Sequence, residues 1–470
     1  MKKILIFLLL LAVTFVTGCS DGNDGEINLE ADESKKCNIE FYVYDNKTAY
    51  EKLAAQFNKL YPNWTISIRE DKAEYFDHLK TYFGAGMAPD MFFMESGEIG
   101  SFIREGDLLN LQPFIDNGTD LKESDLWEAN DGYRYNEDTG KLGAKDGDLY
   151  ALAKDLSADY IMVYNKSHID EYNQTHDVSL QELIGYPSDD GVYPSETIPM
   201  TWAQNEEFCY RLAKFDSNGG FERYGTVFDY TPWRHVMEWV QQQGASLFSE
   251  DGKTFNATDE RVIAAFQHLT NYCYGPKASS TPLDTHSVDT GIGFKSGSVS
   301  VVWAGRWSFR AYDWYDLPFE YGVAPGAVRY EGDNAYTTTC YVGISISSTC
   351  KNPAVAYKFL EYILTAGVRQ EIRTGESFNV PSNYTIASSD AYLNSEDESQ
   401  NVLNRYFYNM TKIAEPLKFS QYINTSTMES KLALNYGYTW NSANHLTPAE
   451  ALLKCKKDIE TEINKVVSRL

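Results

Sequence analysis

Apolar residues in this sequence repeat first with the period of a strand, then with that of a helix, and then with that of a strand again. Apolar and polar residues alternate over residues 39–43, as in a half-buried β-strand. Thr48 and Glu51 then have the spacing of a capping box, and apolar residues recur at helical intervals up to Tyr61-Pro62. Alternation returns over residues 64–68. A strand, a helix and a strand in this order form the unit of a parallel sheet, so an α/β fold is expected.

The same succession of strands and helices continues along the chain. A helix is predicted over residues 75–83 and a buried strand over the wholly apolar residues 91–94. Two late helices are expected to start at Asn352-Pro353 and Thr447-Pro448, where a capping residue precedes proline. A chain of 470 residues is long enough for two domains, so two doubly wound lobes are predicted. Further elements are expected over residues 150–164, 202–215, 224–230, 299–303 and 341–346, and polar surface loops over residues 131–148 and 185–198.

The first residues have the pattern of an export signal. Met1-Lys2-Lys3 precedes an apolar run that, at roughly 13 residues, is too short to cross a bilayer. Val16-Thr17-Gly18-Cys19 resembles the lipobox of bacterial lipoproteins. Residues 1–18 are therefore expected to be a lipoprotein signal peptide, and two acyl chains on Cys19 would anchor the protein outside the cytoplasm to the bacterial cell membrane. Residues 19–36 are polar, acid-rich and aperiodic, which predicts a flexible tether.

Charge and cysteine content restrict the partners. The formal net charge of -26 repels phosphate backbones and anionic lipid headgroups, which argues against nucleic acid as a partner. Six cysteines remain beyond Cys19. Export would permit disulfides, but the sequence does not choose among the pairings. A bridge between Cys340 and Cys350 is discounted, because a strand between them would hold the two too far apart.

Motifs of the common enzyme classes are missing from the sequence. No H-E-x-x-H, G-x-S-x-G, Walker A or C-x-x-C motif occurs, and Gly291-Ile292-Gly293 lacks the third glycine of a dinucleotide fingerprint. The seven histidines show no metal-ligand spacing. With 67 acidic residues, some pair of carboxylates always suits a glycosidase, so carboxylates alone prove little. We expect no enzymatic activity, no cofactor and no metal.

Residues 75–115 carry the most specific motifs in the chain. A helix leads through Gly86-Met87-Ala88-Pro89-Asp90 to the buried strand, and Gly106-Asp107-Leu108 follows. This arrangement resembles the family 1 extracellular solute-binding proteins, the group that includes maltose-binding and other sugar-binding proteins. Further segments resemble the family in the same order, at residues 149–165, 199–202, 294–297, 305–307 and 347–364 and at Val380-Pro381.

The resemblance implies a type II fold like that of the periplasmic binding proteins, in which two discontinuous lobes close around a hinge and a ligand cleft. Its three crossovers are expected at residues 153–157, near Tyr341 and at residues 378–381. Lobe 1 would comprise residues 37–153 plus 341–377, and lobe 2 residues 154–340 plus 378–470. Ala153 and Cys340 depart from the residues usual at these positions in the family.

The resemblance also implies a function. The chain is expected to be a monomeric component of an ABC importer that captures a mono- or oligosaccharide and delivers it to a membrane permease. A protein that presents its ligand to a sensor, or a surface glycan-binding protein, is the alternative, and a secreted glycosidase is a more distant one. Met94-Glu95 stands where the maltose-binding members have an aromatic residue, so maltodextrin specificity does not carry over.

A sugar offers hydroxyl groups and patches of C–H, so its site needs flat aromatic faces and polar acceptors. In open α/β sheets such groups stand on loops after the strands. Trp307, in the segment that resembles the family's G-x-W, is the first candidate for stacking, and Arg306 is a candidate donor. Arg306 and Asp155 could equally form an ion pair between the lobes. The other candidates are Asp45, Asn46, Glu95, Tyr230, Trp233 and Tyr422.

Overall fold

The computed structural model describes residues 28–184, 198–228, 232–280, 288–377, 379–395, 398–437 and 446–469. The predicted signal peptide, the lipidation site Cys19 and the candidate Tyr230 lie outside these ranges. Within them, no helix combines the length and the apolar character needed to cross a membrane.

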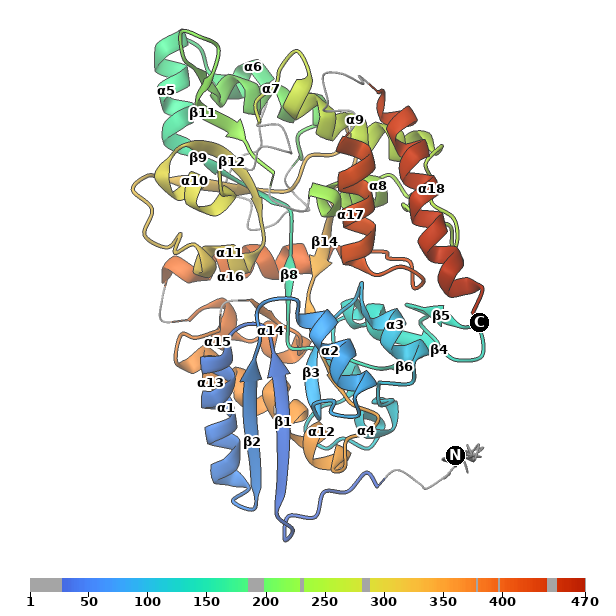
Figure 1. Cartoon of the computed structure of the whole chain (residues 1–470). Coiled ribbons are helices and arrows are strands. Elements are labelled where there is room, and N and C mark those ends of the chain that lie inside the picture. The colour runs from blue at the N-terminus through green and yellow to red at the C-terminus, as the bar shows by residue number, and fades with distance from the viewer. Residues whose placement is uncertain are drawn as a thin grey trace, which may run out of the picture.

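A mixed sheet forms the centre of lobe 1, in the lower half of Figure 1. β1 is flanked by β2 and β3, and both run parallel to it. The helix α1 (Lys47–Leu60) connects β1 to β2, as the sequence predicts. β15 runs antiparallel to β3, so a segment from late in the chain completes a sheet begun at its start. The strand order is β2 (Trp64–Glu70), β1 (Cys37–Val43), β3 (Met91–Glu95), β15 (Val342–Ile346) and β7 (Leu152–Ala153).

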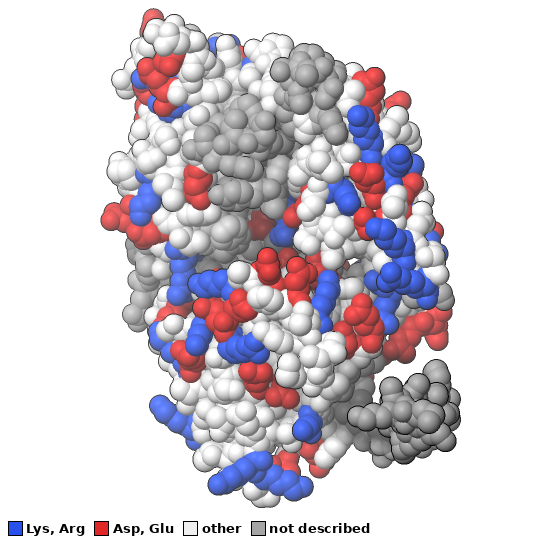
Figure 2. Space-filling view, viewed as in Figure 1, with Lys and Arg blue, Asp and Glu red and all other residues white. Residues whose placement is uncertain are grey.

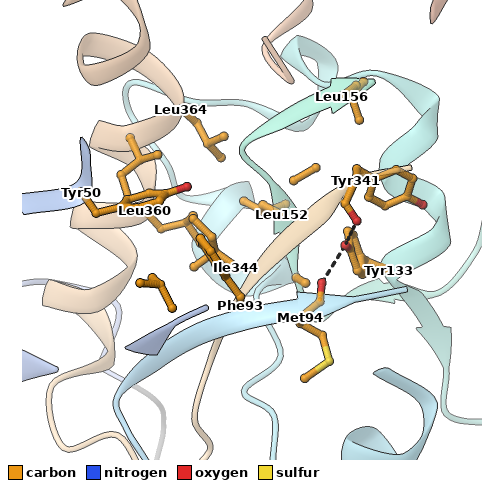
Figure 3. Packing of buried hydrophobic residues seen from close by; sticks show 14 of the residues in the cluster. Tyr50, Phe93, Met94, Tyr133, Leu152, Leu156, Tyr341, Ile344, Leu360 and Leu364 are labelled. Atoms are coloured by element: carbon orange, nitrogen blue, oxygen red, sulfur yellow. Dashed lines mark hydrogen bonds between the residues drawn. The ribbon is translucent and has the colours of Figure 1, made fainter. Parts of the chain in front are cut away.

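The core of lobe 1 forms where helices cover this sheet. Phe93 and Ile344 of the sheet lie near Leu360 in Figure 3. In the same view the Tyr133 hydroxyl donates to the carbonyl oxygens of Met94, at 2.8 Å, and Tyr341, at 3.2 Å. The helices of this lobe are α2 (Tyr75–Gly84), α3 (Ile99–Arg104), α4 (Gln112–Asp116), α12 (Pro353–Tyr362) and α13 (Val368–Arg373), with short 3-10 turns at Glu123–Asp125 and Glu128–Tyr133 and a π-helical turn at Ile363–Gly367.

Lobe 2 has its own five-stranded sheet and its own apolar core. Alternate residues of β9 and β12 face opposite sides, so Met162, Tyr164 and Trp303 join a core beneath the helices α7 to α9. The strand order is β10 (Lys214–Phe215), β11 (Phe221–Thr226), β12 (Val299–Ala304), β9 (Ile161–Asn165) and β13 (Tyr321–Ala324). The helices are α5 (Lys166–His176), α6 (Leu180–Ile184), α7 (Trp202–Leu212), α8 (Pro232–Gln241), α9 (Glu260–Tyr274), α10 (Thr290–Ser296), α11 (Arg306–Ala311), α17 (Thr425–Tyr436) and α18 (Pro448–Val467).

A third sheet lies between the two lobes, where β8 and β14 run from one half of Figure 1 to the other. Its order is β16 (Val380–Pro381), β8 (Asp155–Ala158), β14 (Thr337–Cys340) and β17 (Ala414–Pro416), and α14 (Tyr384–Ala387), α15 (Asp390–Leu393) and α16 (Glu398–Thr411) lie beside it. The crossovers expected from the sequence fall on or next to three of these strands. The exact boundaries of the lobes remain a prediction.

The prediction of a surface loop over residues 131–148 is wrong in part. Short stretches of this segment form a three-stranded sheet of β5 (Lys141–Leu142), β4 (Arg134–Asn136) and β6 (Asp148–Leu149), and turns connect them. The strands carry no apolar alternation that the sequence could reveal. Arg134 of β4 is held instead by ion pairs with Asp131 and Glu123. Gly140 takes the left-handed φ of 65° that the hairpin turn requires.

Candidate ligand-binding site

Polar side chains follow β1 and β3 at the edge of lobe 1 that faces lobe 2. Asp45 and Asn46 are exposed, and the Asn46 amide donates to the Asp45 carboxylate at 2.9 Å. Asn46 has a left-handed φ of 60° directly before α1, and such strained positions concentrate at functional sites. The Tyr44 hydroxyl donates to Glu95 Oε1 at 3.1 Å, so the ends of the two strands are linked. The structure thus brings together three of the sequence candidates, Asp45, Asn46 and Glu95, in one region.

Glu95 also contacts lobe 2. Arg234 Nη2 lies 3.4 Å from Glu95 Oε2, and Arg234 Nε lies 3.4 Å from Glu429 Oε1. Burial raises the pKa of Glu429, with Arg234 opposing and Glu95 adding to that rise. Arg234 therefore bridges a carboxylate of each lobe. The face of the molecule seen in Figure 2 is hollowed between the lobes, and acidic and basic side chains gather at its lower rim.

Trp307 presents part of its ring at the surface, whereas its indole N–H is held by the protein. The side chain is 38% exposed, and Nε1 donates to Asp159 Oδ1 at 3.1 Å. Asp159 is buried, and its backbone N–H donates to the Thr338 carbonyl. A Cβ on Gly305 would lie 1.9 Å from Asp159 Oδ1 and 2.6 Å from Trp307 Nε1, so only glycine fits between the carboxylate and the indole. A ring that is fixed by its edge and partly exposed is suited to stacking on a sugar.

Arg306 and Trp233 point into the protein. Arg306 is fully buried and donates to the Tyr315 hydroxyl at 2.7 Å and to Asn404 Oδ1 at 3.0 Å. Trp233 is buried in lobe 2 against Phe266 and Tyr436. In each case the next residue in the chain lies at the lobe boundary instead. Trp307 follows Arg306, and Arg234 follows Trp233. That either contacts a ligand remains a prediction.

Asp155 lies on β8 in the sheet between the lobes. Its Oδ1 accepts from Asn379 at 2.9 Å, and its Oδ2 lies 3.8 Å from Lys154 Nζ. Lys154 also pairs with Glu371 at 3.2 Å. Burial would lower the pKa of Lys154, but Tyr50, Glu371 and Asp155 together raise it, so the ammonium stays charged. Asp155 thus pairs with Lys154 rather than with Arg306.

Tyr422 lies between cations of the two lobes. Arg104 Cζ of lobe 1 is 5.6 Å from the centre of its ring, and Lys253 Nζ of lobe 2 is 5.7 Å from it. The positions of Tyr422 and Trp307 thus mark two separate places along the boundary. Among the described residues, no three His, Cys, Asp or Glu side chains are grouped closely enough to hold a metal ion.

Sequence reasoning missed Asp159 and Arg234. Asp159 directly follows the strand β8 and precedes Tyr160, a non-glycine residue with a left-handed φ of 61°. Its contact with Trp307 joins residues 148 positions apart, so no local pattern marks it. Only Gly305 could have indicated this contact from the sequence, since glycine is needed where the backbone approaches another group closely.

The two sheets, each with its own helical cover, and the strands that cross between them define a two-lobed binding protein of the periplasmic type. A family model for the bacterial extracellular solute-binding proteins matches residues 44–370. The chain belongs to this family, whose members are extracellular binding proteins. A comparison with curated protein sequences finds no match.

Solved structures share this fold at low sequence identity. An ABC substrate-binding protein from Listeria monocytogenes in complex with cycloalternan is 21% identical, with a TM-score of 0.70 over 92% of this chain and 100% of that one. The sugar-binding protein MalE from Xanthomonas citri is 15% identical, with a TM-score of 0.70 over 91% of this chain and 98% of that one. MalE from Bdellovibrio bacteriovorus bound to maltotriose is 16% identical, with a TM-score of 0.66 over 91% of this chain and 100% of that one.

Proposed function

We propose that this protein is the extracytoplasmic capture component of an ABC importer, and that it binds a carbohydrate when the two lobes close. The observation that carries the proposal is the pairing of Trp307 with Asp159 at the boundary of a two-lobed fold. The indole offers a partly exposed face to the C–H surface of a sugar, and the carboxylate fixes its orientation. The solved relatives that hold cycloalternan and maltotriose support the same ligand class.

An uncharged sugar suits the charges at the lobe boundary. Lys154 and Arg234 each contact two carboxylates, and Lys80 lies 3.5 Å from Glu98. Lys154 and Arg234, neutralised in this way, offer little to a phosphate or a uronic acid, and the net charge of -26 repels such ligands at longer range. The ligand is therefore a neutral mono- or oligosaccharide.

The ligand is tested by thermal shift against neutral oligosaccharides, including cycloalternan and maltotriose, beside sugar phosphates and peptides. A ligand at a hundred times its Kd stabilises the native state by about 2.7 kcal/mol, which moves the melting temperature measurably. Tryptophan fluorescence should change on binding of the same sugar, and the sugar should be recovered intact. Stabilisation by peptides or phosphates alone would refute the proposal.

The protein is anchored through Cys19 and delivers its ligand, as a monomer, to the transmembrane permease subunits of the importer. Cys19→Ser should release the protein from the membrane, because two acyl chains are what make anchoring stable. Immunoblots of membrane and soluble fractions compare this variant with Cys37→Ser, which leaves the lipobox intact. Retention of Cys19→Ser in the membrane fraction contradicts the anchor.

Lobe 1 comprises residues 37–153 plus 341–377, and lobe 2 residues 154–340 plus 378–470. The strands β8, β14 and β16 serve as the hinge in this proposal, since they stand where the chain passes between the two lobe sheets. Asp45, Asn46, Glu95, Asp155 and Tyr422 then line the closing cleft with Trp307, and Arg306 and Trp233 support it from behind.

A further inference from the structure

One part of the lobe boundary is occupied by protein on both sides. Gln421, in the segment that precedes α17, places its amide against β5, the edge strand of the small sheet in lobe 1. Gln421 Nε2 donates to the Gly140 carbonyl at 2.7 Å, and the Leu142 N–H donates to Gln421 Oε1 at 3.1 Å. A side-chain amide thus makes the pair of hydrogen bonds that another strand would make with this edge.

The helix α3 of lobe 1 contacts the same segment through its ends. Arg104 donates to the Gln421 carbonyl. At the other end, the Thr425 N–H, in the first turn of α17, donates to Glu98 Oε1 at 3.1 Å. Glu98 is only 3% exposed and also lies 3.5 Å from Lys80 Nζ. The Glu98 side chain thus supplies an acceptor for one of the N–H groups that have no partner within α17.

Glycines bring the two surfaces into direct contact. A Cβ on Gly97 would lie 1.9 Å from Thr425 Oγ1, and a Cβ on Gly100 would lie 3.0 Å from Gln421 Cα. There is consequently no room between α3 and this segment for a ligand, or for a methyl group on Gly97. The polar contacts here are made by protein groups alone, so no ligand atom is needed to complete them.

We propose that Glu98, Arg104 and residues 140–142 of lobe 1, together with Gln421 and Thr425 of lobe 2, form a latch that closes without ligand and seals one part of the cleft. This inference rests on the closure of the lobes, but not on the identity of the ligand. The latch restricts a bound sugar to the rest of the boundary, and it must release before the lobes separate.

Amide hydrogen exchange in the full-length, unliganded protein tests the latch. Peptides that contain the Leu142 and Thr425 amides should be protected from exchange, because both N–H groups donate across the boundary. Gln421→Ala should raise the exchange rate of both amides at least tenfold and leave the cores of both lobes unchanged. Gly100→Ala should do the same by steric overlap instead of by loss of a hydrogen bond.

Gln267→Ala is the matched control, since that amide donates to Asn271 within α9 alone. It should leave both peptides protected. Full exchange of Leu142 and Thr425 in the unliganded wild type would overturn the inference, as would an unchanged Thr425 in both latch variants. A negative sugar screen would instead remove the proposed ligand class and leave these exchange results as they stand.

Discussion

The lobe boundary is built in two contrasting ways, at Trp307 and at the latch. Both places use a glycine to bring polar groups together, and a Cβ would lie 1.9 Å from Asp159 Oδ1 at Gly305 and 1.9 Å from Thr425 Oγ1 at Gly97. At Gly305 the close approach joins residues of the proposed lobe 2, and part of the Trp307 ring stays exposed. At Gly97 the close approach joins lobe 1 to lobe 2, and it leaves no room for a ligand between the two surfaces.

The difference distinguishes a group that stays partly exposed and can contact a ligand from a group whose contacts are all made by protein. A binding group has to be held from one side only, so that its other face remains free at little cost in ordering. A latch group has partners on both sides and gains nothing from a ligand. Substitutions at the two places should therefore differ in kind, since one set alters affinity through contacts and the other alters the population of the closed form.

The largest loss of affinity is expected for Asp159→Ala. Removal of a buried charged acceptor that holds the Trp307 indole should cost about 2 to 3 kcal/mol, which is roughly a 30- to 150-fold rise in Kd. Isothermal titration calorimetry measures this rise in Kd, with the sugar that gives the largest thermal shift. Asp159→Asn keeps an acceptor for the indole and should lose less.

The control for Asp159 is Asp313→Ala, which removes an exposed carboxylate that pairs with Lys295 on the surface of lobe 2. Its Kd should match the wild type. Equal effects of the Asp159 and Asp313 variants would show that overall charge, and not the position beside Trp307, decides the affinity.

Trp307→Ala should weaken binding at least tenfold, or by about 1.4 kcal/mol, because the stacking face is lost while Asp159 remains. Tyr274→Ala provides the comparison, since Tyr274 on α9 is 43% exposed but belongs to no proposed site. Titration calorimetry with the same sugar measures both variants. An unchanged Kd for Trp307→Ala would show that Trp307 does not contact the sugar. The comparison between a binding group at Trp307 and the latch would then fail.

The sequence predicts the lobe sheets well because their signals are local. Alternation over residues 39–43 and 64–68, and the apolar run over residues 91–94, each lie within one element. The crossovers came from the family resemblance, and they lie on or beside strands of the sheet between the lobes. The hairpin over residues 134–142 was missed, since polar strands held by ion pairs do not alternate in hydropathy.

The site was harder to predict, because it depends on the orientation of each helix relative to the core. Trp233 and Arg234 are neighbours on α8, yet Trp233 points into lobe 2 and Arg234 towards Glu95. The sequence favoured the aromatic residue here and also at Trp307, which is partly exposed and whose role in binding stays a prediction. Gln421 and Asp159 act through partners far away in the chain, which no spacing along the sequence reveals.

The smallest expected effect is a pH dependence confined to the latch. Burial raises the pKa of Glu98 from 4.5 to about 7, with Glu95 of β3 adding to the rise and Lys80 of α2 and the Thr425 N–H opposing it. Once the latch opens, Glu98 regains water and its ordinary pKa, so the closed latch binds a proton that the open latch releases. The resulting stabilisation is fully present below the ordinary pKa and is lost as the pH rises through about 7.

Exchange at Thr425, corrected for the intrinsic pH dependence of amide exchange, should consequently be slower at about pH 5.5 than at about pH 8. Glu98→Gln stays neutral at every pH and should abolish the difference. Glu105→Gln, an exposed residue at the end of the same helix, should preserve it. Because Trp307 and Asp159 make no contact with Glu98, the stacking contact itself should not share this dependence. A pH response that survives in Glu98→Gln would place the proton elsewhere and leave the latch without its titrating group.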